Sequence, residues 1–159
     1  MALPAFDRID FLIPGNYADD DPLAGLETTL RLIQRGEALG YDGAWVRQRH
    51  LERGISSGAA FLAAASQRTE RIGLGTAVIP LGYENPFRLA EDLATVDILA
   101  RGRLNVGVST GAPAFAGLIA GLTDAAPGAD YGHGRAERLA RALSGAPLAT
   151  ERLAGNAAG

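Results

Sequence analysis

Four short β-prone runs recur along the chain at intervals of about 30 residues, and this spacing constrains the fold more than any other feature of the sequence. The runs cover residues 9–13, 43–46, 72–79 and 104–108. An interval of about 30 residues accommodates a strand, a crossover helix and two short loops. Helix-type patterns fill the intervals, so the sequence predicts an α/β fold with a parallel sheet and right-handed βαβ crossovers.

Helix signals occupy the first two intervals. Residues 23–39 form an amphipathic pattern with one apolar stripe. The stripe consists of Leu26, Leu30 and Ile33. Asp21-Pro22 is typical of a helix start, because the carboxylate caps free N–H groups and proline fits the first turn, and Gly40 is typical of a helix end. An alanine-rich stretch over residues 57–67 predicts a second, short helix that can pack closely against a sheet.

A third helix is predicted to begin at Asn85-Pro86 and to end at Gly102. Its predicted core-facing residues are Leu89, Leu93, Val96 and Leu99. Its predicted water-facing residues are Arg88, Glu91, Asp92 and Arg101.

The regular pattern weakens after Val108. Residues 109–131 are rich in Gly, Pro, Ala and Asp and predict a long loop, in which residues 115–122 are open to a helical turn or two. A last helix is predicted over residues 134–143. It would turn Leu139 and Leu143 inward and expose a basic stripe of Arg135, Arg138 and Arg141. These elements predict one domain over residues 1–146 and a fraying tail over 147–159.

The number of repeats limits the architecture. A closed eight-stranded α/β barrel needs about 250 residues, whereas this chain has 159 residues and four clear strand-helix units. The chain is therefore expected to form a half barrel or an open sheet. A half barrel leaves edge strands and apolar helix stripes unpaired, so it must dimerise, lack its other half or be marginal in solution.

Composition excludes several classes of chemistry. The formal net charge of −3 argues against a nucleic-acid partner. All fifteen basic residues are arginine and cysteine is absent, which excludes lysine-based covalent catalysis and thiolate chemistry. The two histidines, His50 and His133, lie far apart, so no metal site is expected. No run approaches the ~20 apolar residues of a membrane span, and the start lacks a signal-peptide pattern, so a cytoplasmic location is expected.

Candidate functional residues follow the strands, because parallel α/β folds place their sites at the carboxyl ends of the strands. The loop after the second strand, residues 47–53, is the most polar and cationic stretch of the chain. Residues 80–85 and 109–113 follow the third and fourth strands. No spacing indicates a Ser-His-Asp triad, and the Gly-x-Gly pairs lack the third glycine and the lysine of phosphate-binding loops.

Several segments together resemble one known family. They are Gly40-Tyr41-Asp42-Gly43-Ala44-Trp45-Val46 with His50, residues 62–65, residues 69–78, Asn85-Pro86-Phe87-Arg88-Leu89-Ala90-Glu91-Asp92 with Val96-Asp97, and Gly102-Arg103-Leu104-Asn105-Val106-Gly107-Val108. In order and spacing over about residues 9–111 they resemble the bacterial luciferase-like family of flavin-dependent monooxygenases. The family fold is a TIM-type (β/α)8 barrel, and this chain resembles its amino-terminal half.

The resemblance implies a flavoprotein that uses reduced FMN, or in some relatives a deazaflavin, with O2 and a small organic substrate. It also allows a flavin reductase as a partner. In the family a Glu-His-His-like motif follows the second strand, and its first histidine lies near the flavin. Here the matching residues are Gln48-Arg49-His50, so Arg49 and His50 are the expected catalytic residues.

The resemblance also implies the cofactor-binding residues. The family has a non-proline cis peptide beneath the flavin ring on the third strand, which matches Thr76-Ala77 or its neighbour. After the fourth strand, where luciferases direct a basic residue toward the FMN phosphate, this sequence has Ser109 and Thr110. Hydroxyl groups can donate to phosphate but add no charge, so weaker binding is expected from this half.

The same residues also have structural interpretations. Arg49 can pair with Glu52 or Glu84, His50 can be a surface residue of a charged loop, and Thr76 can be an inward strand residue. Glu91 and Asp92 can pair with Arg88, and Trp45 can be a core residue. At the level of function, the alternatives to a monooxygenase are a catalytically silent half barrel, acting as a structural or flavin-binding homo-oligomer, and an open-sheet module for another phosphate-bearing ligand.

Overall fold

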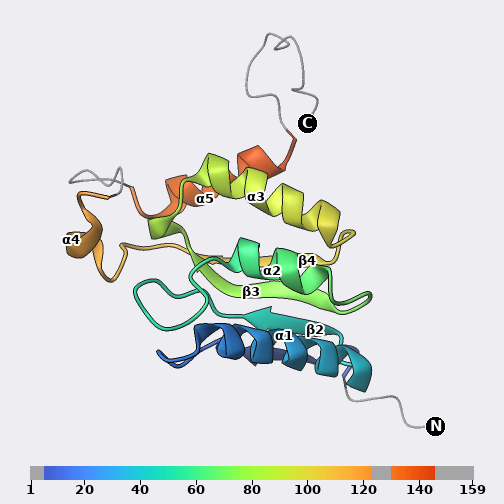
Figure 1. Ribbon diagram of the computed structural model, residues 1–159. Coiled ribbons are helices and arrows are strands. Elements are labelled where there is room, and N and C mark those ends of the chain that lie inside the picture. Colours follow the sequence, from blue (N-terminus) through green and yellow to red (C-terminus); the bar gives the residue numbers. More distant parts are fainter. Residues whose placement is uncertain (1–5, 123–129, 146–159) are drawn as a thin grey trace, which may run out of the picture. The chain divides into compact units, whose positions relative to one another are not determined.

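The fold comes from a computed structural model, which describes residues 6–122 and 130–145 (Figure 1). The tail predicted at 147–159 lies outside these residues. The chain divides into two units. The first contains Met1–Ile79 and Thr95–Ser109, and the second contains Pro80–Ala94 and Thr110–Gly159.

A four-stranded sheet forms the centre of the first unit. Its strands are β1 (Asp10–Ile13), β2 (Gly43–Val46), β3 (Gly73–Pro80) and β4 (Leu104–Ser109), and they lie in sequence order. β1 pairs with β2 and β2 pairs with β3, both in parallel. Helices connect successive strands, so the predicted parallel βα repeats are confirmed.

Helix α1 (Pro22–Leu39) follows the predicted pattern closely. The Asp21 side chain accepts a hydrogen bond from the Ala24 N–H at 2.9 Å and caps the helix start. Gly40 ends the helix with φ +85°, a left-handed conformation that glycine adopts without a steric penalty. Leu30 and Ile33 are buried and Leu26 is half-buried, as the predicted stripe requires.

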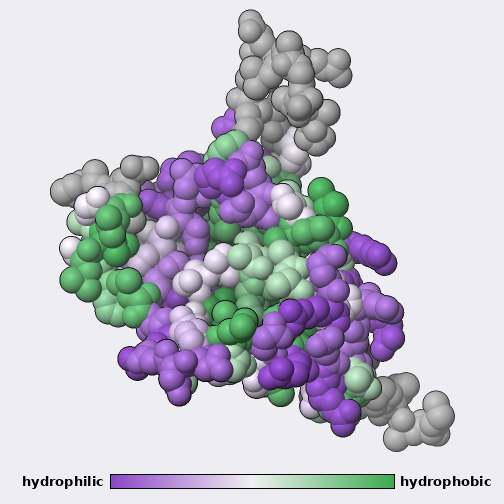
Figure 2. All heavy atoms as spheres, viewed as in Figure 1, coloured by the Kyte–Doolittle hydropathy of each residue, from purple (hydrophilic) through white to green (hydrophobic). Residues whose placement is uncertain are grey.

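Helix α2 (Gly58–Ser66) is the short alanine-rich helix that the sequence predicts. Ser57 caps it by accepting from the Ala60 N–H at 3.3 Å. Figure 2 shows the pale apolar surface of α2 beside the polar residues of α1. In Figure 1 both helices lie in front of the strands, on one face of the sheet.

The two faces of the sheet differ in burial. Leu74, Ala44 and Val46 are completely buried, and so are Ile33 of α1 and Leu62 of α2. Alternate residues of a strand point to opposite faces. Leu12 lies on the other face of the sheet and remains 55% exposed, and every residue of β4 is half-buried. The sheet is therefore covered by helices on one face and open on the other.

Trp45 is half-buried rather than a full core residue. Its indole N–H donates to the Asp10 carboxylate at 2.8 Å, and a Cβ on Gly75 would lie 2.4 Å from its ring. The tryptophan thus lies across the glycine of the neighbouring strand on the less covered face of the sheet.

Helix α3 (Pro86–Leu99) begins in the second unit and ends in the first. Asn85 Oδ1 accepts from the N–H groups of Phe87 and Arg88, and Arg88 pairs with Glu91 and Asp92 as predicted. The prediction that Leu99 faces the core is wrong, because Leu99 is 43% exposed and Ala100 is buried instead. The buried positions 89, 93, 96 and 100 keep the helical period, and position 99 falls outside it.

The second unit also contains a 3-10 turn (Leu81–Tyr83), α4 (Ala116–Ile119) and α5 (His133–Leu143). α4 lies within the stretch that is predicted to be a loop, where residues 115–122 could also form a helical turn or two. Leu139 is buried as predicted. The prediction for Leu143 is wrong: this residue ends α5 and is 47% exposed.

Arg135 is not part of a solvated basic stripe, which corrects the prediction for this residue. Its guanidinium donates to the carbonyl oxygens of Asp130, Leu81 and Glu84, and lies 5.5 Å from the centre of the Tyr131 ring. It therefore ties the start of α5 to the turn after β3, whereas Arg138 and Arg141 are exposed.

Candidate functional site

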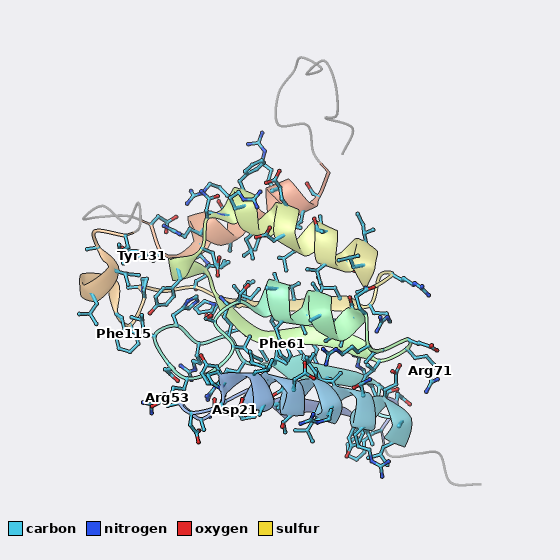
Figure 3. The ribbon with its side chains drawn as sticks, in the orientation of Figure 1. Asp21, Arg53, Phe61, Arg71, Phe115 and Tyr131 are labelled. Atoms are coloured by element: carbon cyan, nitrogen blue, oxygen red, sulfur yellow. The ribbon has the colours of Figure 1, made fainter. Side chains whose placement is uncertain are left out.

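Two loops meet at the carboxyl ends of β1 and β2. The Tyr17 N–H donates to the Arg53 carbonyl oxygen at 3.3 Å, and Arg47 Nη2 donates to Asn16 Oδ1 at 3.3 Å. In Figure 3, Asp21 and Arg53 lie at this end of the unit, and Arg71 lies at the opposite end. The most polar loop of the sequence is therefore fixed where parallel α/β folds place their sites.

A buried glutamine organises this loop. The Gln48 side chain is 3% exposed, and its Oε1 accepts from the Gly58 N–H at 2.8 Å, at the start of α2. Its Nε2 lies 3.0 Å from His50 Nε2. The sequence shows Gln48 only as part of a motif, because residue type does not distinguish a buried amide side chain from a solvated one.

Arg49 and His50, the two expected catalytic residues, both lie in this loop. Arg49 is exposed, its Nη1 lies 3.9 Å from Glu52 Oε1, and its backbone N–H donates to the Ile55 carbonyl oxygen at 2.8 Å. The predicted pairing with Glu52 is thus observed, although such an exposed pair contributes at most about 1 kcal/mol. His50 is half-buried and is held by Gln48.

Arg47 carries an unsatisfied donor at the same place. Its Nε is buried and has no hydrogen-bond partner within residues 6–122 and 130–145. A buried N–H without a partner costs roughly 1–3 kcal/mol, so such a group favours an acceptor atom beside it.

Thr76 and Ala77, two of the expected cofactor-binding residues, lie on β3. Thr76 is completely buried, and its hydroxyl donates to the Gly107 carbonyl oxygen of β4 at 3.0 Å. Ala77 is half-buried, and the peptide bond between Ala77 and Val78 is cis. The expected non-proline cis peptide therefore occurs at the neighbour of the Thr76–Ala77 bond.

Gly58 connects the loop to β3. A Cβ at this position would lie 2.9 Å from Thr76 Cγ2 and 3.1 Å from Gln48 Oε1. The structure thus brings His50, through Gln48 and Gly58, to the same region as Thr76.

Ser109 and Thr110, the other expected cofactor-binding residues, fall in different units. Ser109 is the last residue of β4 and is half-buried, whereas Thr110 is exposed and belongs to the second unit. Within the first unit, Ser109 therefore marks the carboxyl end of the fourth strand.

Two carboxylates of α1, Glu37 and Glu27, and Arg68, between α2 and β3, have shifted pKa values. Partial burial acts to raise the pKa of Glu37, but the backbone N–H groups of Arg71, Ile72 and Glu70, with the charge of Arg71, lower it overall. The Arg68 guanidinium hydrogen-bonds Glu27 and lowers the pKa of that carboxyl, and Glu27 raises the pKa of Arg68. These carboxylates hold α1 to the segment before β3.

Two pockets lie away from the expected site residues. In the second unit, a pocket of about 390 Å³ is lined by Asn85, Pro86, Phe87, Arg138, Arg141 and Ala142. In the first unit, a pocket of about 210 Å³ is lined by Glu37, Gly40, Tyr41, Asp42, Arg71 and Ile72. The second pocket is at the opposite end of the sheet from the polar loop.

The described part of the chain shows no cluster of three or more His, Asp or Glu side chains that could hold a metal ion. In the same residues, no helix has both the length and the apolar character required to cross a bilayer.

Several known proteins are similar to this chain in sequence or in fold. Limonene 1,2-monooxygenase of Rhodococcus erythropolis is 37% identical over 111 residues, which are 67% of this chain and 29% of that enzyme. The crystal structure of apo-MsnO8 superposes with a TM-score of 0.77 at 19% identity and covers 96% of this chain and 46% of that one. An oxygenating component of 3,6-diketocamphane monooxygenase from Pseudomonas putida, in complex with FMN, gives a TM-score of 0.63 at 14% identity, over 87% and 38% of the two chains.

These likenesses establish a TIM-type barrel as the parent fold, as the sequence predicted, and the chain spans less than half the length of each of these proteins. Coenzyme F420 appears in the names of other similar proteins, and FMN is bound in the 3,6-diketocamphane monooxygenase component. The model of the family described as luciferase-like monooxygenase matches residues 9–141. Because this match extends over most of the chain, the protein belongs to the luciferase-like monooxygenase family.

Proposed function

We propose that this chain is part of a flavin-dependent monooxygenase that uses reduced FMN and O2 on a small organic substrate. The family match over residues 9–141 carries this proposal. The likeness to limonene 1,2-monooxygenase supports the oxygenase class. A deazaflavin is the alternative cofactor, because F420-dependent glucose-6-phosphate dehydrogenase of Amycolatopsis mediterranei is 36% identical over 83 residues.

The residues at the carboxyl ends of β1 to β3 fit a flavin in two respects. The buried Nε of Arg47 has no acceptor among the residues that the structure describes, and the flavin carbonyl and phosphate oxygens are acceptors. Beside it, the sheet face opposite α1 and α2 is only partly covered, and a flat ring needs such a surface. On this proposal Arg47 and Ser109 would donate hydrogen bonds to the cofactor.

Reduced FMN, when bound, supplies the electrons that activate O2. The chain's own residues would bind and orient it. We propose that Thr76 acts indirectly: its hydroxyl is engaged with the Gly107 carbonyl oxygen, so it holds β3 against β4 next to Ala77. Arg49 and His50 would lie at the reacting side, where Arg49 supplies an exposed positive charge and Gln48 holds His50.

Isotope labelling tests the proposed activity. The purified chain is supplied with reduced FMN, 18O2 and limonene, and the product is analysed by mass spectrometry. We expect one 18O atom in an oxygenated terpene, and Arg49→Ala and His50→Ala should each lower its yield at least about tenfold, the range for loss of one positioned polar group. Arg88→Ala on α3 removes an equal charge outside the site and should leave the yield unchanged.

The absence of labelled product from limonene and from other small apolar substrates, with bound FMN present, would contradict the oxygenase activity. Unchanged yields in both loop variants would remove Arg49 and His50 from the reacting side.

A catalytically silent half barrel that associates with a second copy is the other candidate. The exposed face of the sheet favours it, because Leu12 is exposed there and β4 is half-buried throughout. Light scattering distinguishes the two candidates when it is combined with flavin binding: a dimer that binds no flavin supports the silent half barrel.

A further inference from the structure

The hydrogen bonds around Gln48 determine which nitrogen of His50 carries the proton. The Gly58 backbone N–H can only donate, so the Gln48 atom facing it at 2.8 Å must be the carbonyl oxygen Oε1. The amide NH2 group therefore faces His50. Because an amide NH2 can only donate, His50 Nε2, 3.0 Å away, must accept.

We infer that Gln48 is a positioning residue that holds His50 as the neutral imidazole with its proton on Nδ1. The hydrogen bond to one ring nitrogen sets the tautomer of the other. Gln48 can impose this choice because it is buried and anchored at the start of α2, so its amide cannot turn over without facing the Gly58 N–H with an NH2 group.

The tautomer defines what His50 can contribute to the proposed reaction, and this part of the inference rests on the proposed function. With Nε2 accepting from Gln48, a proton cannot bind there unless that hydrogen bond breaks. The only N–H of the His50 ring is then on Nδ1, and Nε2 cannot act as a general base while that hydrogen bond holds. The role of His50 therefore differs from that of Arg49. Gln48 holds the His50 ring, whereas the Arg49 side chain is exposed and paired with Glu52.

Nitrogen NMR of the ligand-free chain tests the tautomer directly. The chain has only two histidines, so His50→Gln assigns both imidazoles, and the exposed His133 serves as an internal reference. The spectra are recorded at pH about 8, where an ordinary imidazole is neutral. We expect the 15N shifts of His50 to show a protonated Nδ1 and an unprotonated Nε2. A protonated Nε2 in the unsubstituted chain would overturn the inference.

Two substitutions test whether Gln48 imposes this state. In Gln48→Glu, one carboxylate oxygen can still accept from the Gly58 N–H, and the other requires a proton on His50 Nε2. We expect the His50 spectrum to change to a protonated Nε2, either as the other neutral tautomer or as the imidazolium. Gln48→Met, of similar shape, removes the donor and should increase the Nε2-protonated population without adding charge.

Gln34→Glu on α1 is the matched control, since it makes the same chemical change at an exposed position. It should leave the His50 spectrum unchanged. If His50 keeps its proton on Nδ1 in both Gln48 variants, Gln48 is not the positioning residue.

Flavin titration of the same variants separates this inference from the proposed function. If the chain binds FMN, Gln48→Glu should weaken binding by about tenfold relative to Gln34→Glu, as expected for the change of one buried hydrogen-bonding group. If the unsubstituted chain binds no flavin, the proposed function fails while the NMR result still decides the tautomer. Equal flavin affinities of the two variants would overturn a role for the tautomer in cofactor binding.

Discussion

Two residues near the carboxyl ends of the strands, Gly58 and Gln48, are closely constrained by their contacts. Gly58 begins α2, donates its N–H to Gln48, and leaves no room for a side chain between Thr76 and Gln48. Gln48 is equally constrained, because its amide contacts two groups of opposite hydrogen-bonding character. The sequence marks this loop as polar, but it does not reveal which of its side chains is buried. Burial depends on contact with α2, about ten residues further along the chain.

Gly58→Ala tests the close contact. The added methyl group would lie 2.9 Å from Thr76 Cγ2, so β3 or α2 must shift. We expect the free energy of unfolding to fall by about 1–3 kcal/mol, as for other overpacked positions. Gly117→Ala on α4 is the control: nothing lies within 4 Å of the added Cβ, and chemical denaturation should show no loss of stability there.

Arg103, which directly precedes β4, makes several hydrogen bonds at the amino ends of the strands. Its guanidinium donates to the carbonyl oxygens of Ala100, Ile72, Ser66 and Thr69 and to the Thr69 hydroxyl. These acceptors come from the end of α2 and the segments before β3 and β4, so one side chain joins three parts of the first unit. The sequence shows Arg103 only as part of the Gly102-Arg103 motif.

Arg103→Lys should therefore destabilise the chain although it keeps the charge. A lysine ammonium has three donors and lacks the planar fork, so several of these carbonyl oxygens lose their partners. We expect a loss of about 2 kcal/mol in denaturant unfolding. Arg101→Lys, at a neighbouring exposed residue, should cost less than about 0.5 kcal/mol, and equal effects of the two changes would contradict this role of Arg103.

At the scale of elements, the helix and strand limits follow from local signals. Asp21-Pro22, Gly40, Ser57 and Asn85 all act at helix ends as their residue types predict. The errors fall near helix ends, where the presence or absence of contacts with residues distant in sequence decides whether a side chain is buried. Leu99 and Leu143 fit an apolar pattern but are exposed at the last turns of their helices. Arg135 fits a solvated basic stripe but donates to the carbonyl oxygens of Leu81 and Glu84, some fifty residues earlier.

Glu37 joins two elements, because its carboxylate accepts the N–H groups of residues 70–72 and so fixes the end of α1 to the start of β3. Its pKa is lowered in the folded state, so its contribution is complete above the unfolded value of about 4.5 and is lost as the pH falls through the lower folded value.

Glu37→Gln should remove this part of the acid sensitivity. At pH 7 we expect the free energy of unfolding to fall by about 1 kcal/mol, a modest value because the carboxylate is partly exposed. Below pH 4 the difference from the unsubstituted chain should shrink. Urea unfolding between pH 3 and 7 measures it, with Glu137→Gln on α5 as an exposed control. A difference that stays constant with pH would show that the charge of Glu37 is not involved.

At the scale of the whole molecule, the described residues form four βα units, and within them the sheet is open on one face and at its two edge strands, β1 and β4. The number of repeats in the sequence predicts the four units and a half barrel, and the coverage of 46% of apo-MsnO8 agrees with this prediction. The hydrophobic pattern of the strands could not indicate what lies against the open face. A parallel strand that is covered on one face has the same apolar run in its sequence as a strand that is covered on both faces.

Titration with oxidised FMN, followed by quenching of flavin fluorescence and with light scattering on the same sample, tests the central claim most directly. The account predicts saturable binding of one FMN per chain in the micromolar range, with a dimer or larger species as the binding form. The absence of saturation at about 1 mM FMN, where a site would contribute only about 4 kcal/mol, would contradict a flavin site in this chain.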